Sequence, residues 1–134
     1  AGGGVGGSVE RGPLVERARA VRANAHAPYS GFAVGAALLA GDGRIFVGVN
    51  VESAAFPAGV CAERAALAAA LAAGARELVA IAVAGSGHVP CVPCGVCRQA
   101  LHDLAPGLEV LAAGEGGEAV PYRLHDLLPH PFGP

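Results

Sequence analysis

The sequence contains no lysine, methionine or tryptophan, and aromatic residues make up only 4% of its 134 residues. Hydrophobic residues nevertheless account for 53%, so a core has to be assembled from alanine, valine and leucine side chains in close contact. A chain of this length buries roughly two-thirds of its unfolded surface on folding, which is enough for one domain with its own core.

A strong charge of either sign is also absent, because nine arginines stand against eleven acidic residues and the formal net charge is -2. Four arginines gather near the N-terminus: Arg11, Arg17, Arg19 and Arg22. A surface that follows phosphates normally belongs to a basic domain. We therefore interpret these arginines as the solvated face of a helix and expect no nucleic-acid partner.

Segments that target or anchor a protein are missing as well. Residues 1–8, AGGGVGGS, show neither the charged start nor the apolar stretch of a secretory signal, and we expect a flexible glycine-rich tail there, followed by a single domain over residues 9–134. No apolar run reaches the ~18 residues of a membrane span. We expect a soluble, cytoplasmic protein without a membrane partner, whose four cysteines are metal ligands or reactive thiols rather than disulfides.

The hydrophobic pattern predicts alternating helices and strands. A helical stripe runs from Pro13 to Ala25, and two β-prone runs flank the turn Gly41-Asp42-Gly43. The remaining predicted elements are helices over Cys61 to Ala73 and Gly95 to Leu104, and strands over residues 78–84, 108–112 and 120–123. The order helix, hairpin, α-β-α-β-β predicts a three-layer α/β fold.

The predicted helix from Cys61 to Ala73 is rich in alanine on every face and ends at Gly74. A helix that is apolar all round is buried all round. In a domain this small, one face meets the sheet and the opposite face most plausibly meets another subunit, so we expect a homo-oligomer.

The cysteines are placed where strands pass into helices. Three lie in PCVPCGVCRQ (residues 90–99), and Cys61 lies two residues before Glu63. Ligands of open α/β sheets bind at the carboxyl ends of strands, so Cys61 and Cys94 should converge, with Cys97 on the same helix face as Cys94. Helix N-termini lower thiol pKa values, which predisposes all three to be thiolates. Three thiolates with an open fourth position suit a catalytic zinc ion.

Two neighbours of Cys61 carry complementary chemistry. Glu63 can take a proton from a metal-activated water and return it to a substrate. Arg64 is placed to donate hydrogen bonds to the sulfurs and to offset the net negative charge of the centre. A ligand-x-Glu followed by Pro-Cys-x-x-Cys is the signature of zinc-dependent nucleobase deaminases, and it stands here as CAE and PCGVC.

The sequence resembles the small homotetrameric cytidine deaminases over nearly the whole chain after the glycine tail. The motifs that carry the resemblance are YSGFAVGAALL (29–39), GVNVES (48–53), GVCAER (59–64), PCGVCRQAL (93–101) and LLPHPFGP (127–134). It implies their fold, a three-layer α-β-α sandwich around a mixed five-stranded sheet. It also implies one zinc ion per subunit, held by Cys61, Cys94 and Cys97, with Glu63 as the proton shuttle.

Further residue roles follow from the resemblance. Asn50 and Glu52 hold the ribose 3'-hydroxyl, Phe32 lies against the base, and the main chain of Ala62 fixes the pyrimidine edge. Phe132 is expected to reach the site of a neighbouring subunit. Taken without the resemblance, Asn50 and Glu52 could be a plain strand end, Phe32 a core residue and Phe132 a plug between subunits.

The sequence departs from the family at three positions, since Ser53 stands where asparagine is frequent, Phe56 where tyrosine is frequent, and Cys91 where the family has no cysteine. Cys91 leaves two structural alternatives open, a closed four-cysteine zinc site and an iron–sulfur motif. The iron–sulfur spacing fails because Leu101 stands where the last cysteine is required.

The resemblance implies hydrolysis of free cytidine and 2'-deoxycytidine to uridine and 2'-deoxyuridine, with release of ammonia, in pyrimidine salvage. Hydroxide attacks C4 of cytosine, Glu63 protonates N3, and ammonia leaves. The alternatives are a deaminase of another cytosine nucleoside such as blasticidin S, a non-catalytic zinc module and an RNA-editing domain. The low basic charge disfavours RNA.

Overall fold

The protein is described by a computed structural model that covers residues 2–134, with side chains described from Arg11 onward. One sheet has the strand order β2-β1-β3-β4-β5. The strands are β1 (Val34–Ala40), β2 (Ile45–Val49), β3 (Leu78–Gly85), β4 (Glu109–Ala113) and β5 (Val120–Arg123). β3 and β4 are parallel and the other neighbouring pairs are antiparallel, so the mixed five-stranded sheet is confirmed.

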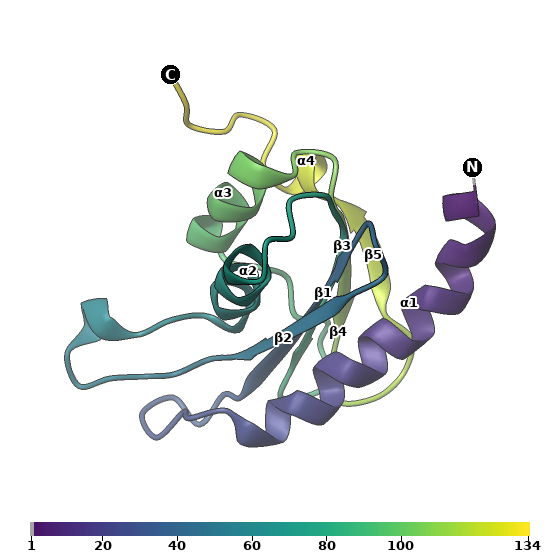
Figure 1. Ribbon diagram of the computed structural model, residues 1–134. Coiled ribbons are helices and arrows are strands. Elements are labelled where there is room, and N and C mark those ends of the chain that lie inside the picture. Colours follow the sequence, from purple (N-terminus) through teal and green to yellow (C-terminus); the bar gives the residue numbers. More distant parts are fainter. Residues whose placement is uncertain (1) are drawn as a thin grey trace.

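Helices cover both faces of the sheet (Figure 1). They are α1 (Gly2–Val21), α2 (Ala62–Ala72), α3 (Gly95–Leu104) and α4 (Leu124–Leu127). On one face, Leu14 and Ala18 of α1 pack on small strand residues such as Ala82. On the other, α2 and α3 lie side by side and bury Ala66 and Leu101 in a second core cluster. These clusters make the predicted three layers.

Glycines end two elements as the sequence predicts. In the hairpin between β1 and β2, Gly43 has a φ of 93° and donates its N–H to the carbonyl of Ala40 at 3.0 Å. Gly74, with a φ of 88°, follows the end of α2. Both conformations are favourable only for residues without a side chain.

The observed elements differ most from the predicted ones at the first helix, which runs from Gly2 rather than Pro13, and near the C-terminus. The first helix ends at Val21 and tightens into a 3₁₀ turn over Arg22–Asn24, which is a frequent way to end a helix. The four-residue α4 was not predicted, because so short a helix shows no periodicity. The backbone from Gly2 is helical, but the mobility expected of residues 1–8 stays a prediction, since residue 1 and the side chains through residue 10 lie outside the described residues.

Candidate active site

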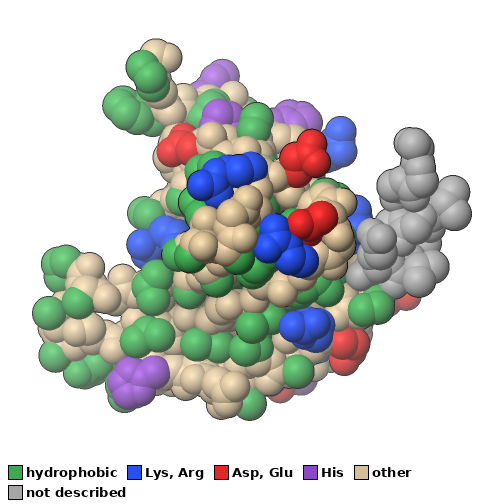
Figure 2. Space-filling view, viewed as in Figure 1, with side chains coloured by type: hydrophobic (Ala, Val, Ile, Leu, Met, Phe, Trp, Pro, Cys, Tyr) green, Lys and Arg blue, Asp and Glu red, His purple; other side chains and the backbone are tan. Residues whose placement is uncertain are grey.

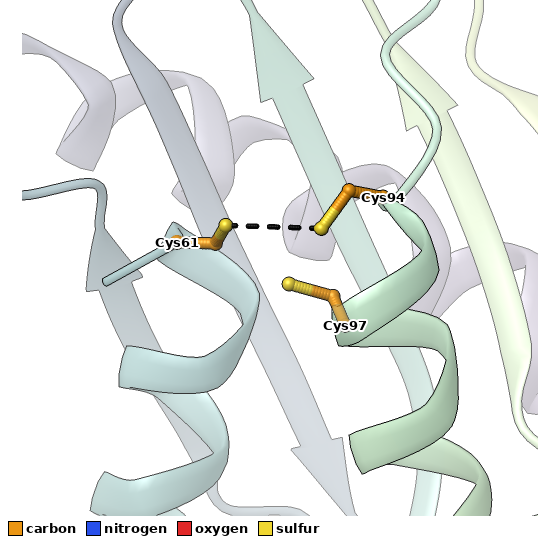
Figure 3. Close-up of side chains that lie close together, drawn as sticks. All are labelled: Cys61, Cys94 and Cys97. Atoms are coloured by element: carbon orange, nitrogen blue, oxygen red, sulfur yellow. Dashed lines mark hydrogen bonds between the residues drawn. The ribbon is translucent and has the colours of Figure 1, made fainter. Parts of the chain in front are cut away.

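Three cysteine sulfurs meet between α2 and α3 (Figure 3). Cys61 directly precedes α2, Cys94 directly precedes α3, and Cys97 lies in the first turn of α3. The three Sγ atoms all lie within 4.8 Å of one another, and those of Cys61 and Cys94 are 3.9 Å apart. The convergence predicted from the strand-to-helix positions is confirmed.

The spacing of the sulfurs fits a tetrahedral zinc ion. Zinc–sulfur bonds of ~2.3 Å at tetrahedral angles place two sulfurs about 3.8 Å apart, close to the observed 3.9 Å. Cys97 is buried whereas Cys94 is exposed. The centre is therefore closed on the protein side and open toward solvent, as a catalytic site requires.

The prediction that all three thiols are predisposed to ionise is wrong for Cys97. Burial raises the pKa of the Cys97 thiol well above its usual range, and the nearby charges of Glu63 and Cys61 act in the same direction. Burial also acts to raise the pKa of Cys94, but hydrogen bonds from the main chain and thiol of Cys97 and from Cys61 outweigh it and lower that pKa. For the buried sulfur of Cys97, the rise in pKa caused by desolvation therefore exceeds the fall in pKa expected from the helix N-terminus.

Glu63 lies in the first turn of α2 with only 4% of its surface exposed. Desolvation by burial raises its pKa, against the opposing effects of its own main-chain N–H and the charge of Arg64. A carboxyl group with a raised pKa can both accept and return a proton near neutral pH. The Nη2 atom of Arg64, the next residue, donates to the sulfur of Cys61 at 3.8 Å.

A cavity of about 570 Å³ lies over this centre. Its lining includes the sequence-predicted residues Asn50, Glu52, Cys61, Ala62, Glu63, Arg64 and Cys94. Segments that are far apart in the sequence therefore enclose one space of the size expected for a small-molecule site. Phe32 and Phe132 are not among the residues that line it.

Asn50 and Glu52 share one side of this cavity, and both also hold the loop that leads into β1. The Oδ1 atom of Asn50 accepts the N–H of Val34 at 2.8 Å, and its Nδ2 donates to the carbonyl of Phe32 at 2.9 Å. Asn50 therefore fixes both ends of a short main-chain segment, and within the described part of the chain no group accepts the second N–H of its amide.

Glu52 binds the same loop through Ser30, a residue that the sequence analysis did not single out. Oε1 of Glu52 accepts the N–H groups of Tyr29 and Ser30 at 3.0 Å each, and Oε2 accepts the Ser30 hydroxyl. The Ser30 oxygen in turn accepts the N–H of Phe32 at 2.9 Å. The hydroxyl bond is the largest cause that lowers the pKa of Glu52.

Phe32 is 43% exposed, and its ring lies against Gly85 beside Cys91. A methyl group on Gly85 would stand 2.8 Å from that ring and 2.9 Å from Cβ of Cys91. The glycine thus makes room for both side chains at the end of β3. The ring lies next to the cavity residue Cys91 rather than in the core.

Phe132 lies on the extended C-terminal tail with 85% of its surface exposed. Its main chain is held by Gln99 of α3, which the sequence analysis also missed. The N–H of Phe132 donates to Oε1 of Gln99 at 2.9 Å, and its carbonyl accepts from Nε2 at 2.8 Å. Asp103 accepts a further bond from the same Nε2 at 2.9 Å.

Cys91 lines the cavity but does not join the sulfur cluster. Among the described residues, the three-sulfur group contains Cys61, Cys94 and Cys97 alone. Burial, reinforced by the charges of Glu63, Cys61 and Cys94, raises the pKa of Cys91 to about 11. The position of Cys91 outside this three-sulfur group disfavours the closed four-cysteine site.

Three thiols beside a buried carboxyl group, at the N-termini of two helices on a mixed sheet, define the class of zinc-dependent base and nucleoside deaminases. The family described as "Cytidine and deoxycytidylate deaminase zinc-binding region" matches residues 10–112. This chain belongs to that family, and Cys61, Cys94 and Cys97 are positioned to hold the zinc ion of such a domain.

Similar proteins agree over most of the chain. A cytidine deaminase of Halalkalibacterium halodurans is 40% identical over 125 residues, which cover 92% of this chain and 95% of that protein. One of Mycobacterium tuberculosis is 44% identical over 112 residues, covering 83% and 80%. The crystal structure of cytidine deaminase from Burkholderia pseudomallei superposes with a TM-score of 0.86 at 50% identity, covering 90% of this chain and 97% of that one. The resemblance and the fold predicted from the sequence are confirmed.

Proposed function

We propose that this protein is a hydrolase of pyrimidine salvage that deaminates cytidine and 2'-deoxycytidine to uridine and 2'-deoxyuridine with release of ammonia. The single observation that carries the proposal is the buried carboxyl group of Glu63 beside three converging sulfurs. Relatives that are 40% and 44% identical are named cytidine deaminases. The same chemistry on this scaffold is the simplest use of the site.

In this proposal the three-cysteine site activates water and Glu63 transfers protons. Cys61, Cys94 and Cys97 would hold a zinc ion, which would supply the polarisation that makes a water molecule nucleophilic at neutral pH. Glu63 accepts the proton that this water loses and delivers it to N3 of cytosine, so that C4 can accept the oxygen. The carboxylate then takes the remaining proton from the oxygen added at C4 and passes it to the amino group, so that the C4–N bond breaks, ammonia leaves and the oxygen becomes the carbonyl of the product.

Asn50 and Glu52 retain the right groups for a sugar hydroxyl. The amide of Asn50 keeps one N–H that it does not spend on the loop, and a carboxylate can accept more hydrogen bonds than the three that Glu52 receives. One donates to a hydroxyl oxygen and the other accepts its proton. In this proposal the main chain of Ala62 meets the pyrimidine edge and Phe32 lies against the base.

The cavity favours a free nucleoside over a nucleotide. Among the described residues that line it, Arg64 is the one cation, and its guanidinium is bonded to the sulfur of Cys61. Phosphates are usually met by several cationic or main-chain donors. The absence of a second cation at the described lining supports cytidine and disfavours cytidine monophosphate and nucleic acid.

We extend the proposal to a homotetramer with shared active sites. Figure 2 shows hydrophobic side chains on the segment that projects between β2 and α2 and on the C-terminal tail, and Phe56 and Phe132 are 82% and 85% exposed. Ala68 and Ala69 on the outer face of α2 are exposed too. Large exposed apolar side chains mark surfaces that meet another protein. Burying them between subunits would bring Phe132 to a neighbour's cavity.

A cytoplasmic location completes the proposal. Within residues 2–134, the helices are too short or too polar for any of them to cross a bilayer. The four cysteines are free thiols, which suits a reducing compartment.

Ammonia release from cytidine by the zinc-loaded protein, measured beside Glu63→Gln, tests the function. Because the amide cannot carry the proton, we expect turnover to fall by at least about a hundredfold while zinc stays bound. Cytidine monophosphate and blasticidin S serve as competing substrates. Preferential turnover of blasticidin S would show that the proposed substrate is wrong. Zinc binding without any turnover would show that the protein is a non-catalytic zinc module.

A further inference from the structure

Gly48 of β2 lies directly beneath the first turn of α2. A Cβ atom built on Gly48 would stand 2.5 Å from the carbonyl oxygen of Ala62, closer still to the main-chain nitrogen of Ala66, and 2.9 Å from Cβ of Ala65. Side-chain carbons practically never come within 3.0 Å of such atoms. The strand and the helix therefore touch main chain to main chain at this one position.

The turn that rests on Gly48 is the one that carries the chemistry. Cys61 directly precedes it and Glu63 lies within it. The carbonyl of Cys61 accepts the N–H of Ala65 at 3.0 Å, which ties the ligand to the turn. A displacement of the turn is thereby passed on to both residues.

The sheet beneath is less free to move than the helix above it. Gly48 lies on the edge strand β2, where it is paired with Ala36 in a continuous register, and β1 is an interior strand of the sheet. β1 is hydrogen-bonded to β2 on one side and to β3 on the other, which fixes the part of the sheet beneath α2. A side chain at position 48 would therefore lift the start of α2.

The expected shift exceeds what the metal centre tolerates. Raising the 2.5 Å separation to between 3.0 and 3.4 Å moves the turn by about 0.5–0.9 Å. Ligand distances in a zinc site are fixed to about ±0.2 Å. Cys94 directly precedes α3 and Cys97 lies in its first turn; this helix does not rest on Gly48, so only Cys61 would move.

We propose that Gly48 is a positioning residue that sets the height of Cys61 and Glu63 above the sheet and so brings Cys61 into register with Cys94 and Cys97. The role rests on the zinc centre of the proposed function, but not on which nucleoside is deaminated. It explains why the strand that leads to Asn50 and Glu52 has a residue without a side chain at this point.

The test is the zinc affinity of Gly48→Ala, measured by competition with a chromophoric chelator, together with the absorption spectrum of the cobalt-substituted protein. We expect a ten- to hundredfold weaker affinity, the range typical of changes that displace a ligand indirectly, and a weaker thiolate-to-cobalt charge-transfer band. Neither readout needs turnover. Loss of zinc binding by the wild type would defeat the proposed function, whereas wild-type behaviour of Gly48→Ala would defeat this inference alone.

Gly35→Ala is the matched control. Gly35 lies on the neighbouring β1, and a Cβ there would run into the main chain of α1, at the carbonyl of Ala18 and 2.8 Å from the nitrogen of Arg22. It should lower the melting temperature as Gly48→Ala does and leave the affinity for zinc unchanged. Equal losses of affinity in both variants would show a general loss of stability and overturn the inference.

A milder variant covers the case in which Gly48→Ala does not fold. Ala36 pairs with Gly48 and belongs to the same buried cluster as Ala62 and Ala66. Ala36→Val adds bulk to the cluster that contains Ala62 and Ala66. We expect a smaller loss of zinc affinity in the same direction, and an unchanged affinity in a folded Ala36→Val protein would contradict the proposal.

Discussion

Ser30 shows how one hydroxyl group can link two residues assigned to the substrate. It donates to Glu52 and accepts the N–H of Phe32, so the proposed ribose and base contacts share a single support. Because the loop favours the charged form of Glu52, that support is complete above the usual pKa of 4.5 and is lost as the pH falls through the lowered value. The loop should therefore be intact throughout the neutral range.

Removing the hydroxyl in Ser30→Ala should raise the pKa of Glu52 toward 4.5, since the lost bond is the largest cause of its lowering. The carboxyl carbon of Glu52, followed by NMR between pH 2 and 7, reports this shift. We also expect KM for cytidine to rise several-fold with a smaller change in kcat, because the loop positions substrate without touching the reacting atoms. Ser53→Ala, at a serine whose hydroxyl accepts the N–H of Ala55, is the control, and an unchanged Glu52 titration in Ser30→Ala would refute the link.

Residue identity could be predicted where chemistry and spacing coincide. Cys61, Glu63 and Cys94 were found because a metal and a proton shuttle require those side chains at helix starts. Ser30, Gln99 and Gly48 were missed because their partners lie far away along the chain, 22 positions in the case of Ser30 and Glu52. The burial of Cys97, which reverses its expected acidity, likewise depends on packing that spacing does not show.

At the scale of elements, the C-terminal tail is held to α3 by a side chain that imitates a β-bridge. Gln99 offers one acceptor and one donor to the main chain of Phe132, and Asp103 orients the amide. The tail itself has no regular structure from Leu128 on. Its direction therefore depends on this contact.

Gln99→Ala should release the tail. Each hydrogen bond contributes modestly to stability, so we expect amide exchange at Phe132 to become about tenfold faster, while exchange in β3 stays unchanged. Hydrogen–deuterium exchange resolved by NMR gives both rates. Asp103→Asn, which keeps an acceptor for the amide, serves as the control, and equal exchange at Phe132 in Gln99→Ala and wild type would rule out the clamp.

Elements were predictable where the pattern is long. The order of helices and strands, the hairpin turn and the stop at Gly74 all follow from periodicity and glycine placement, and the structure confirms them. The end of α1 and the existence of α4 depend on one or two turns of backbone. Such short stretches are decided by tertiary contacts, for example the N–H of Leu124 donating to the carbonyl of Leu108.

For the whole molecule, the proposed homotetramer with shared active sites predicts complementation between two defective chains. Glu63→Gln lacks the proton shuttle, and Phe132→Ala lacks the ring, which should raise KM at least about tenfold. In the proposed tetramer, a site formed by two different variants can contain an intact Glu63 from one subunit and an intact Phe132 from its neighbour. We therefore expect activity at low cytidine concentration to exceed that of either pure variant after subunit exchange.

The two pure variants mixed without exchange provide the baseline, and light scattering reports the mass of the assembly. A mixture whose rate is only the average of its components would show that Phe132 acts within its own chain or not at all. A wild-type protein that is a stable monomer would contradict the proposed tetramer. The proposed zinc chemistry would still be tested separately by Glu63→Gln.

The separation of the cysteines along the chain also affects the conformational stability of the protein. Cys61 and Cys94 stand 33 positions apart, with α2 and β3 between them, so a bridging ion acts as a reversible cross-link that shortens the accessible loop of the unfolded chain. Conformational stability then becomes a function of free zinc concentration. Under zinc starvation, such an enzyme would be lost through unfolding and proteolysis as well as through inactivity, which couples its abundance to the metal supply.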